Sequence, residues 1–389
     1  MASTLRHWLQ LSLTNGIGPV LARRLIEKTG SVEAACEASV AMLRTVEGIG
    51  VAGANKIADA LKSAAGEVDR EIDKAAGAGV SIICPDDDSY PILLKEIPDP
   101  PMVLYVRGVM EDRDLHAVAI VGSRKCSNYG REQAERFGAL LAGAGVTVIS
   151  GGARGIDSAA HRGAMQPLNG RTIAVLGCGV DVAYPPENAQ LFLDIPRDGR
   201  GAVVSEYALG TDPRAENFPR RNRLISGLSR GVLVVEADIR SGALITARQA
   251  VDDHGRTVFA LPGRVDNPMS AGPHQLIRDG ATLVTNLEEI LEGLGPLPIG
   301  ATEPTLFSQP KREDQVTEDV VTKVTTPSPK TELSNARQRI LGAVDGQELD
   351  ADGIIDSTGL PAQIVMQELT LMTLKGLIKK VDATRFAKR

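Results

Sequence analysis

Between residues 115 and 295 the chain alternates short apolar runs with longer amphipathic stretches. The apolar runs are residues 117–122, 146–150, 172–177, 202–207, 232–237, 257–262 and 281–284. The inner runs are almost wholly apolar instead of alternating with polar residues, as parallel strands covered on both faces require. Amphipathic stretches such as residues 131–145 and 242–255 predict helices between them. We therefore expect a doubly wound, mostly parallel, Rossmann-like α/β sheet that binds its ligand at the carboxyl edge.

The segments before this sheet domain predict other structure. Residues 1–65 form short helices around two similar turns, Gly16-Ile17-Gly18 and Gly48-Ile49-Gly50, and resemble a helix-hairpin-helix (SAM-like) domain. Such turns offer backbone N–H groups to DNA phosphates, although glycines at helix C-caps of a compact helical domain would look the same. Residues 66–114 form a connecting segment packed on the sheet domain. It has a helix, a short strand and an extended run whose prolines exclude helix.

The C-terminal quarter of the chain divides into a linker and a small domain. Residues 296–331 are rich in proline, threonine and charged residues without apolar periodicity, which predicts a linker. Residues 332–389 return to amphipathic helices before a strand-like tail, which predicts a winged-helix domain. The tail is basic, and its cations either contact DNA or form a solvated face. They are Lys375, Lys379, Lys380, Arg385, Lys388 and Arg389.

Composition narrows the class of protein. A chain of 389 residues with 43% apolar and 24% charged residues is typical of a soluble protein with about two to four domains. No apolar run reaches the ~20 residues of a membrane helix, and no secretory signal is visible. The four cysteines are widely spaced, which favours a reducing cytoplasm and indicates neither a disulfide framework nor a zinc site. The net charge of −6 does not decide the partner.

Glycine- and arginine-bearing turns follow the first two predicted strands. Gly122-Ser123-Arg124 follows the first strand, and the run from Gly151-Gly152 to Arg154 follows the second. A strand that leads through glycine into a helix leaves unpaired N–H groups at the carboxyl edge of the sheet. Arginines at the same edge suit a run of phosphates. These turns therefore predict a polyanion site.

A third element places an aromatic residue and three cations at the start of another helix: Phe218, Arg220, Arg221 and Arg223. The helix dipole repels cations at this end, so the cluster is costly unless an anion offsets it. Basic groups beside an aromatic ring are typical of sites for single-stranded nucleic acid. Each arginine could instead form an ordinary surface salt bridge. We expect all these arginines to converge on the carboxyl edge.

Enzyme motifs are weak or missing. The glycine turns lack the spacing of a dinucleotide site, and no P-loop string occurs. Asp157 and His161 lie four residues apart and could act as an acid–base pair, although His161 could equally pack inside the fold. A nucleotide phosphoribohydrolase would need a carboxylate where Arg248 and Gln249 stand. No cluster has metal-ligand spacing. We therefore expect a binding protein without catalytic residues, cofactor or metal.

Several long motifs occur together in one order: AIVGSRKCSNYG, VISGGARGIDSAAHRGA, TIAVLGCGVDVAYPPENAQLF, the segment from Ser205 to Ala250, and FALPGRVDNPMSAGPHQLIRDGATLV. Over about residues 90–284 they resemble the DNA-processing protein A (DprA/Smf) family. The resemblance implies a cytoplasmic bacterial protein, not an enzyme, that protects incoming single-stranded DNA and loads the RecA recombinase during natural transformation and recombination. Single-stranded-DNA-binding protein is a further candidate partner. The alternatives are a Rossmann-type nucleotide phosphoribohydrolase and a regulator that binds duplex DNA through the winged helix.

The resemblance also assigns residues. It carries the family's Gly-Ser-Arg motif to Gly122-Ser123-Arg124, its Phe-x-x-Arg-Asn element to Phe218, Arg221 and Asn222, and a basic residue before a late strand to Arg256. The expected DNA-binding set is Gly122, Ser123, Arg124, Gly151, Gly152, Arg154, Phe218, Arg220, Arg221, Asn222, Arg223 and Arg256.

The resemblance further implies a homodimer formed by the end of the sheet domain. The residues expected at that interface are His274, Leu276, Ile277 and Leu283. The apolar members of this set could instead pack on the chain's own helix near residues 287–294.

Overall fold

The computed structural model describes residues 2–295, 339–344, 347, 349–360, 365, 369, 372, 378–380 and 385–388. The chain divides into two compact units, Met1–Gln309 and Pro310–Arg389. The expected linker at 296–331, Lys375 and Arg389 lie outside the described residues. In the described ranges no helix has both the length and the apolar character that crossing a bilayer requires.

The first unit is built on a nine-stranded sheet in the order β1-β2-β6-β5-β4-β3-β7-β8-β9. Its strands are β1 (Ser81–Ile83), β2 (Leu104–Gly108), β3 (Ala117–Val121), β4 (Thr147–Ser150), β5 (Thr172–Val175), β6 (Gly201–Ser205), β7 (Gly231–Val234), β8 (Thr257–Ala260) and β9 (Thr282–Leu283). The strands from β3 to β9 are parallel, and β1 and β2 are antiparallel additions at one edge. The seven predicted strands are confirmed, and with them the α/β fold class. β2 was expected only as extended chain.

Helices cover both faces of the sheet, which explains why its strands are apolar throughout. Val118 and Ile120 of β3 join one buried cluster with α8 (Asn128–Gly143), α9 (Ile156–Ala164) and α14 (Leu287–Gly293). Ala119 and its alternate neighbours face the other cluster, under α11 (Asn217–Gly227) and α12 (Gly242–Asp252). Alternate residues of a strand thus pack into two different cores, one on each face of the sheet.

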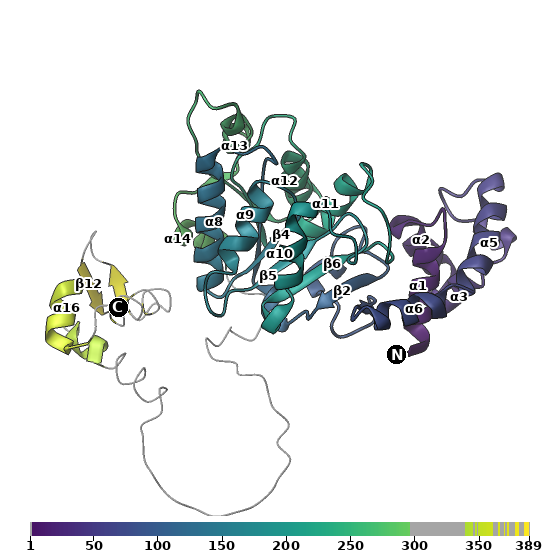
Figure 1. Ribbon diagram of the computed structural model, residues 1–389, viewed down its shortest axis with the longest axis horizontal. Helices are drawn as coiled ribbons and strands as arrows, with labels where there is room; N and C mark the ends of the chain where they lie inside the picture. Colours follow the sequence, from purple (N-terminus) through teal and green to yellow (C-terminus); the bar gives the residue numbers. More distant parts are fainter. Residues whose placement is uncertain are drawn as a thin grey trace, which may run out of the picture. The chain divides into compact units, whose positions relative to one another are not determined.

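Two glycines let α8 and α9 lie side by side on one face of the sheet (Figure 1). A Cβ at Gly138 would overlap the carbonyl oxygen of Ala160, and one at Gly163 would overlap that of Glu135. Any larger residue would force the helices apart, and α9 starts directly at the second glycine turn. This close packing therefore fixes the position of that turn.

The N-terminal helices have a core of their own beyond β1 and β2 (Figure 1). They are α1 (Ala2–Leu13), α2 (Pro19–Thr29), α3 (Val32–Cys36), α4 (Val40–Leu43) and α5 (Val51–Ala65). The next helix, α6 (Val68–Gly77), packs instead into a core cluster with β2 and β6. Gly16 and Gly48 have φ of 93° and 96°, so the two predicted turns share one left-handed conformation before α2 and α5. The predicted repeat is therefore real. Its contact with DNA stays a prediction.

Shorter elements complete this unit: α7 (Ile92–Lys95), α10 (Ala189–Asp194), α13 (Ala271–Arg278) and the 3₁₀ turns Asp112–Leu115, Pro186–Asn188, Arg197–Gly199 and Pro268–Ser270. The run 88–108, which was expected to be extended, contains the short helix α7, whereas no helix forms at the prolines 98–101.

The described part of the second unit has α16 (Ala351–Thr358) and the strands β10 (Leu349–Asp350), β11 (Ile378–Lys380) and β12 (Arg385–Lys388). The strands form an antiparallel sheet in the order β10-β12-β11. Ile340, Val344 and Ile354 belong to its buried core. This helix and small sheet agree with the predicted winged-helix domain.

Candidate functional site

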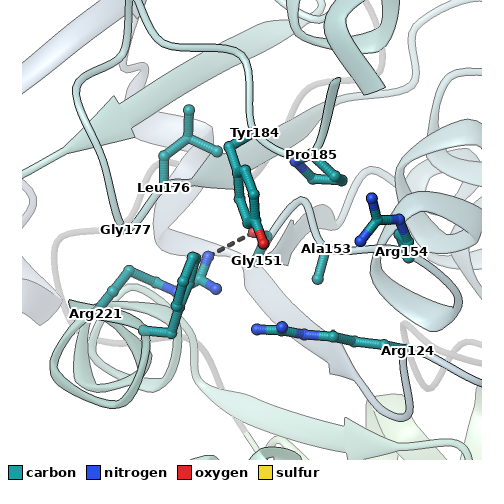
Figure 2. Close-up of a pocket in the computed structure, with 10 residues that line it drawn as sticks. Arg124, Gly151, Ala153, Arg154, Leu176, Gly177, Tyr184, Pro185 and Arg221 are labelled. Atoms are coloured by element: carbon teal, nitrogen blue, oxygen red, sulfur yellow. Dashed lines mark hydrogen bonds between the residues drawn. The ribbon is translucent and has the colours of Figure 1, made fainter. Parts of the chain in front are cut away.

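The loops after β3, β4 and β5 and the first turns of α11 enclose a pocket at the carboxyl edge of the sheet (Figure 2). It is lined by Arg124, Gly151, Ala153, Arg154, Leu176, Gly177, Tyr184, Pro185, Phe218 and Arg221. Five of the expected DNA-binding residues therefore meet in one place: Arg124, Gly151, Arg154, Phe218 and Arg221. Parallel strands bring their carboxyl ends to one edge, so residues far apart in sequence share this pocket.

The loop after β3 presents Arg124 to the pocket. A Cβ on Gly122 would lie 2.5 Å from the Ile156 side chain and 2.7 Å from the carbonyl oxygen of Glu236, so only glycine fits the turn. The backbone N–H of Ser123 donates to that same carbonyl at 2.6 Å. The exposed Arg124 side chain then places its guanidinium carbon 5.1 Å from the centre of the Phe218 ring. A cation therefore stacks on an aromatic face at the pocket.

The loop after β4 brings the second arginine to the rim. Gly152 has φ of 64°, and a Cβ there would lie 2.8 Å from the ring of Phe192. Arg154 Nη2 pairs with both carboxylate oxygens of Glu187, at 2.8 and 3.0 Å. The two side chains are 50% and 61% exposed, so solvent screens this pair. A phosphate could therefore compete with Glu187 for Arg154.

Arg221 is the buried cation of the pocket, with only 3% of its surface exposed. Its Nη1 donates to the carbonyl oxygens of Gly151, at 2.5 Å, and Val175, which ties the carboxyl ends of β4 and β5 together. Figure 2 shows the first of these bonds. Burial lowers the pKa of Arg221 to about 10, so the guanidinium stays charged at neutral pH. The pocket floor therefore holds a buried cation at neutral pH.

Two aromatic rings complete the pocket, that of Phe218, which was predicted, and that of Tyr184, which was not. Phe218 is half-buried, and its ring centre lies 5.5 Å from that of Tyr184 at an interplanar angle of 36°. Tyr184 lies in the irregular loop after β5. The sequence indicates Tyr184 as a pocket residue only through its being an aromatic residue in a loop at the carboxyl edge of the sheet. The two rings offer apolar faces beside the arginines.

The remaining residues of the arginine cluster do not line this pocket. Arg220 is exposed at the start of α11, and no ion pair to it occurs within residues 2–295. Asn222 donates to the carbonyl oxygen of Gly242 at 3.4 Å. The expectation that all the arginines converge on the carboxyl edge of the sheet is wrong for Arg223. This residue is 6% exposed and pairs with Asp99, at 3.1 Å, and with Glu206. Its position two residues after Arg221 turns it to another side of the helix.

Arg256 is likewise outside the pocket. It directly precedes β8, so it stands at the amino end of a parallel strand while the pocket lies at the carboxyl ends. Its Nη2 donates to the carbonyl oxygen of Leu93 at 3.1 Å and lies 3.4 Å from Glu96. Arg256 therefore links β8 to the segment that contains Leu93 and Glu96. This position does not support its expected place in the DNA site.

The Asp157–His161 pair lies inside the fold. His161 is fully buried, with Nδ1 2.7 Å from the hydroxyl of Thr172, and burial lowers its pKa to about 3. Asp157 is 7% exposed, and its carboxylate accepts a hydrogen bond from the N–H of Ala153. A neutral, enclosed histidine cannot exchange protons with a bound substrate. The packing interpretation of His161 is therefore favoured.

The residues expected at a dimer interface lie on α13 and β9. Among the described residues, β9 is the last strand of the sheet and pairs with β8 alone. Leu283 on this edge is 46% exposed, whereas Leu276 packs partly against the core. His274 Nε2 lies 3.0 Å from the carbonyl oxygen of Gly263. Ile277 is half-buried. Leu283 is thus the one apolar residue of this set that is clearly exposed to solvent.

Family models match three parts of the chain. Residues 81–295 match the model described as DNA recombination-mediator protein A. Residues 10–63 match a SAM-like helix-hairpin-helix tandem, and residues 324–383 match a DprA winged helix domain.

Whole-chain relatives agree with these matches. The chain is 34% identical to Protein Smf of Synechocystis sp. over 98% of both chains. It is 43% identical to Protein Smf of Escherichia coli over 77% of this chain and 75% of that one. Its structure is similar to the X-ray structure of DNA processing protein A of Streptococcus pneumoniae, with a TM-score of 0.62 and 34% identity. That match covers 74% of this chain and 95% of the other.

Proposed function

The chain belongs to the DNA recombination-mediator protein A family, known as DprA/Smf, and we propose that its pocket binds single-stranded DNA. The observation that carries the proposal is the meeting of Arg124, Arg221 and Phe218 at one sheet edge. Arginines contact phosphates whatever the sequence, and an aromatic face stacks on any base. The combination favours a strand whose bases are free to turn outward.

Each part of the pocket has a role in this proposal. Arg124 and Arg154 contact backbone phosphates beside the start of α9, where the helix dipole adds to the positive potential. Gly151 in the pocket wall lets the strand approach the backbone, while Gly122, Ser123 and Gly152 shape the turns beside it. Phe218 stacks on one base, and Tyr184 bounds the same space. Arg221 adds positive charge at the buried floor of the pocket. Arg220 extends the basic surface along α11.

Family membership also supports a proposal about the wider role. We propose that the protein protects incoming single-stranded DNA and loads RecA on it during transformation and recombination, acting in the cytoplasm without catalysing a reaction. RecA and single-stranded-DNA-binding protein are its proposed protein partners. The buried Asp157–His161 pair supports a binding role over the hydrolase alternative.

Binding of three labelled ligands at several salt concentrations tests the proposal. We expect the full chain to prefer single-stranded DNA to duplex of the same length, and to bind a mononucleotide weakly. The affinity for single strands should fall with salt because phosphate contacts release counterions. A preference for duplex would favour the winged-helix regulator, and release of free base from a nucleotide would favour the phosphoribohydrolase.

Phe218 is expected to contribute stacking and no charge. Phe218→Ala should weaken single-strand binding by ~1–3 kcal/mol, the usual contribution of one stacked base. The slope of log affinity against log salt should stay unchanged because no phosphate contact is lost. Fluorescence anisotropy over a salt series measures both. Phe218→Trp keeps a ring and should retain affinity, and a reduced slope in Phe218→Ala would mean that the arginines had moved instead.

We also propose that the protein is a homodimer joined through β9 and α13. Leu283→Arg should place an unpaired charge in that interface and give a folded monomer, because an open strand edge with an apolar residue needs a partner. Light scattering measures the mass, and Leu168→Arg, at a loop residue 91% exposed, is the matched control. The monomer should lose more affinity for long strands than for short ones. A wild-type protein that is monomeric at micromolar concentration would refute the dimer.

A further inference from the structure

Glu236 is a buried carboxylate two residues beyond β7, with 1% of its surface exposed. It accepts three hydrogen bonds: from the backbone N–H of Ser127 at 2.8 Å, from the Ser127 hydroxyl at 2.7 Å and from Asn267 Nδ2 at 3.0 Å. Its own carbonyl oxygen accepts the N–H of Ser123 at 2.6 Å. One residue therefore holds both ends of the segment that carries Arg124.

These contacts require a carboxylate. The Ser127 hydroxyl already accepts a hydrogen bond from the N–H of Gly130, so its proton is directed to Glu236. Asn267 Oδ1 accepts from the N–H of Met269, which fixes Asn267 Nδ2 as a donor. All three groups around the carboxylate are then donors. An amide in its place would turn an NH₂ group toward at least one of them.

The surroundings of the carboxylate are built closely around it. A Cβ on Gly130 would overlap the Glu236 carboxylate, so a larger residue at this position would displace the carboxylate from its donors. Gly155 has φ of 78°, and a Cβ on it would lie 2.4 Å from the carbonyl oxygen of Ser123. The loop of Arg124 is thus clamped between the start of α9 on one side and Glu236 on the other. The backbone that carries the Arg124 side chain is therefore held from both sides.

We infer that Glu236 is the positioning residue of the DNA site, holding the 123–127 loop so that Arg124 faces the pocket. The inference rests on the proposed function. Glu236 does not line the pocket, and it acts through Arg124. Arg124 itself is exposed and its guanidinium lies over the Phe218 ring, so its direction depends on the loop beneath it. A loosened loop would spread the guanidinium over positions that miss the phosphate.

A double-mutant cycle between Glu236→Gln and Arg124→Ala tests this inference on the full chain with a fluorescent single-stranded oligonucleotide. Glu236→Gln should weaken binding about fivefold or more, because buried donors lose their acceptor. It should also reduce the magnitude of the salt slope by about 0.7, the share of one phosphate contact on a single strand. In the Arg124→Ala background the same change should weaken binding less than about twofold, since coupled residues are not additive.

Glu289→Gln is the matched control, because the Glu289 carboxylate likewise accepts a backbone N–H, that of Thr285 at 2.6 Å, at the start of a helix that does not line the pocket. It should leave affinity and salt slope unchanged. Should Glu236→Gln fail to fold by near-UV circular dichroism, Asn267→Ala removes one donor and enters the same cycle, with a smaller loss of the same non-additive kind.

Three outcomes are distinguishable. Wild-type affinity in Glu236→Gln overturns the positioning role. An equal loss with and without Arg124 also overturns it, because Glu236 would then act on the fold in general. Absence of single-strand binding by the wild-type protein refutes the proposed function itself.

Discussion

Arg221→Leu is expected to lower the free energy of unfolding by about 2–4 kcal/mol, because two buried carbonyl oxygens lose their donor. The carbonyls are those of Gly151 and Val175, which Arg221 bridges from inside the sheet edge. Asp157 lies beside it, and burial raises the pKa of that carboxyl while the charge of Arg221 opposes the rise. Losing the guanidinium therefore also leaves the buried Asp157 carboxyl without the cation that most strongly opposes this rise. Urea unfolding followed by circular dichroism measures the change.

Arg220→Leu is the matched control for this prediction. It removes the same charge one residue earlier on α11, from an exposed side chain, so stability should change by less than about 0.5 kcal/mol. Equal stability of Arg221→Leu and wild type would show that the bridge between β4 and β5 does not hold the pocket together.

Arg124→Ala should weaken single-strand binding by about 1.5–3 kcal/mol, the contribution of a hydrogen bond to a charged group. That corresponds to roughly 10- to 150-fold in the dissociation constant. The magnitude of the salt slope should fall by about 0.7 because one phosphate contact disappears. Stability should hardly change, since the side chain is exposed and lies against the face of Phe218.

Anisotropy titrations over a salt series measure affinity and slope together. Arg197→Ala is the control, because Arg197 precedes the amino end of β6, at the opposite edge of the sheet, and its side chain is 62% exposed. It should bind like wild type. An unchanged dissociation constant for Arg124→Ala would remove this residue from the DNA site.

The sheet was predictable because its physical signal is local. Strands buried on both faces must be apolar, so the runs that became β3 to β9 stood out along the chain. β2 follows three prolines, which specify extended chain without indicating a partner strand. Whether it pairs is decided by β6, about a hundred residues later. Pattern alone does not carry that information.

The pocket was predictable in outline and less so in detail. Glycine turns after strands predicted the edge where Arg124 and Arg154 lie. The directions of Arg221 and Arg223 depend on long-range partners, because Asp99 and Glu206 draw Arg223 away. Each residue of an α-helix is rotated by about 100° from the one before, so side chains two positions apart point in different directions. This rotation argues against placing both Arg221 and Arg223 in one pocket. Tyr184 lies in an irregular loop where periodicity gives no guidance.

The most direct test of the central claim is photo-cross-linking of the full chain to single-stranded DNA that carries bromodeoxyuridine, with the attached peptides identified by mass spectrometry. Binding in the pocket predicts cross-links to the rings of Phe218 or Tyr184, and their loss in Phe218→Ala combined with Tyr184→Ala. Cross-links confined to residues 10–63 or 324–383, with none near the carboxyl edge of the sheet, would contradict it.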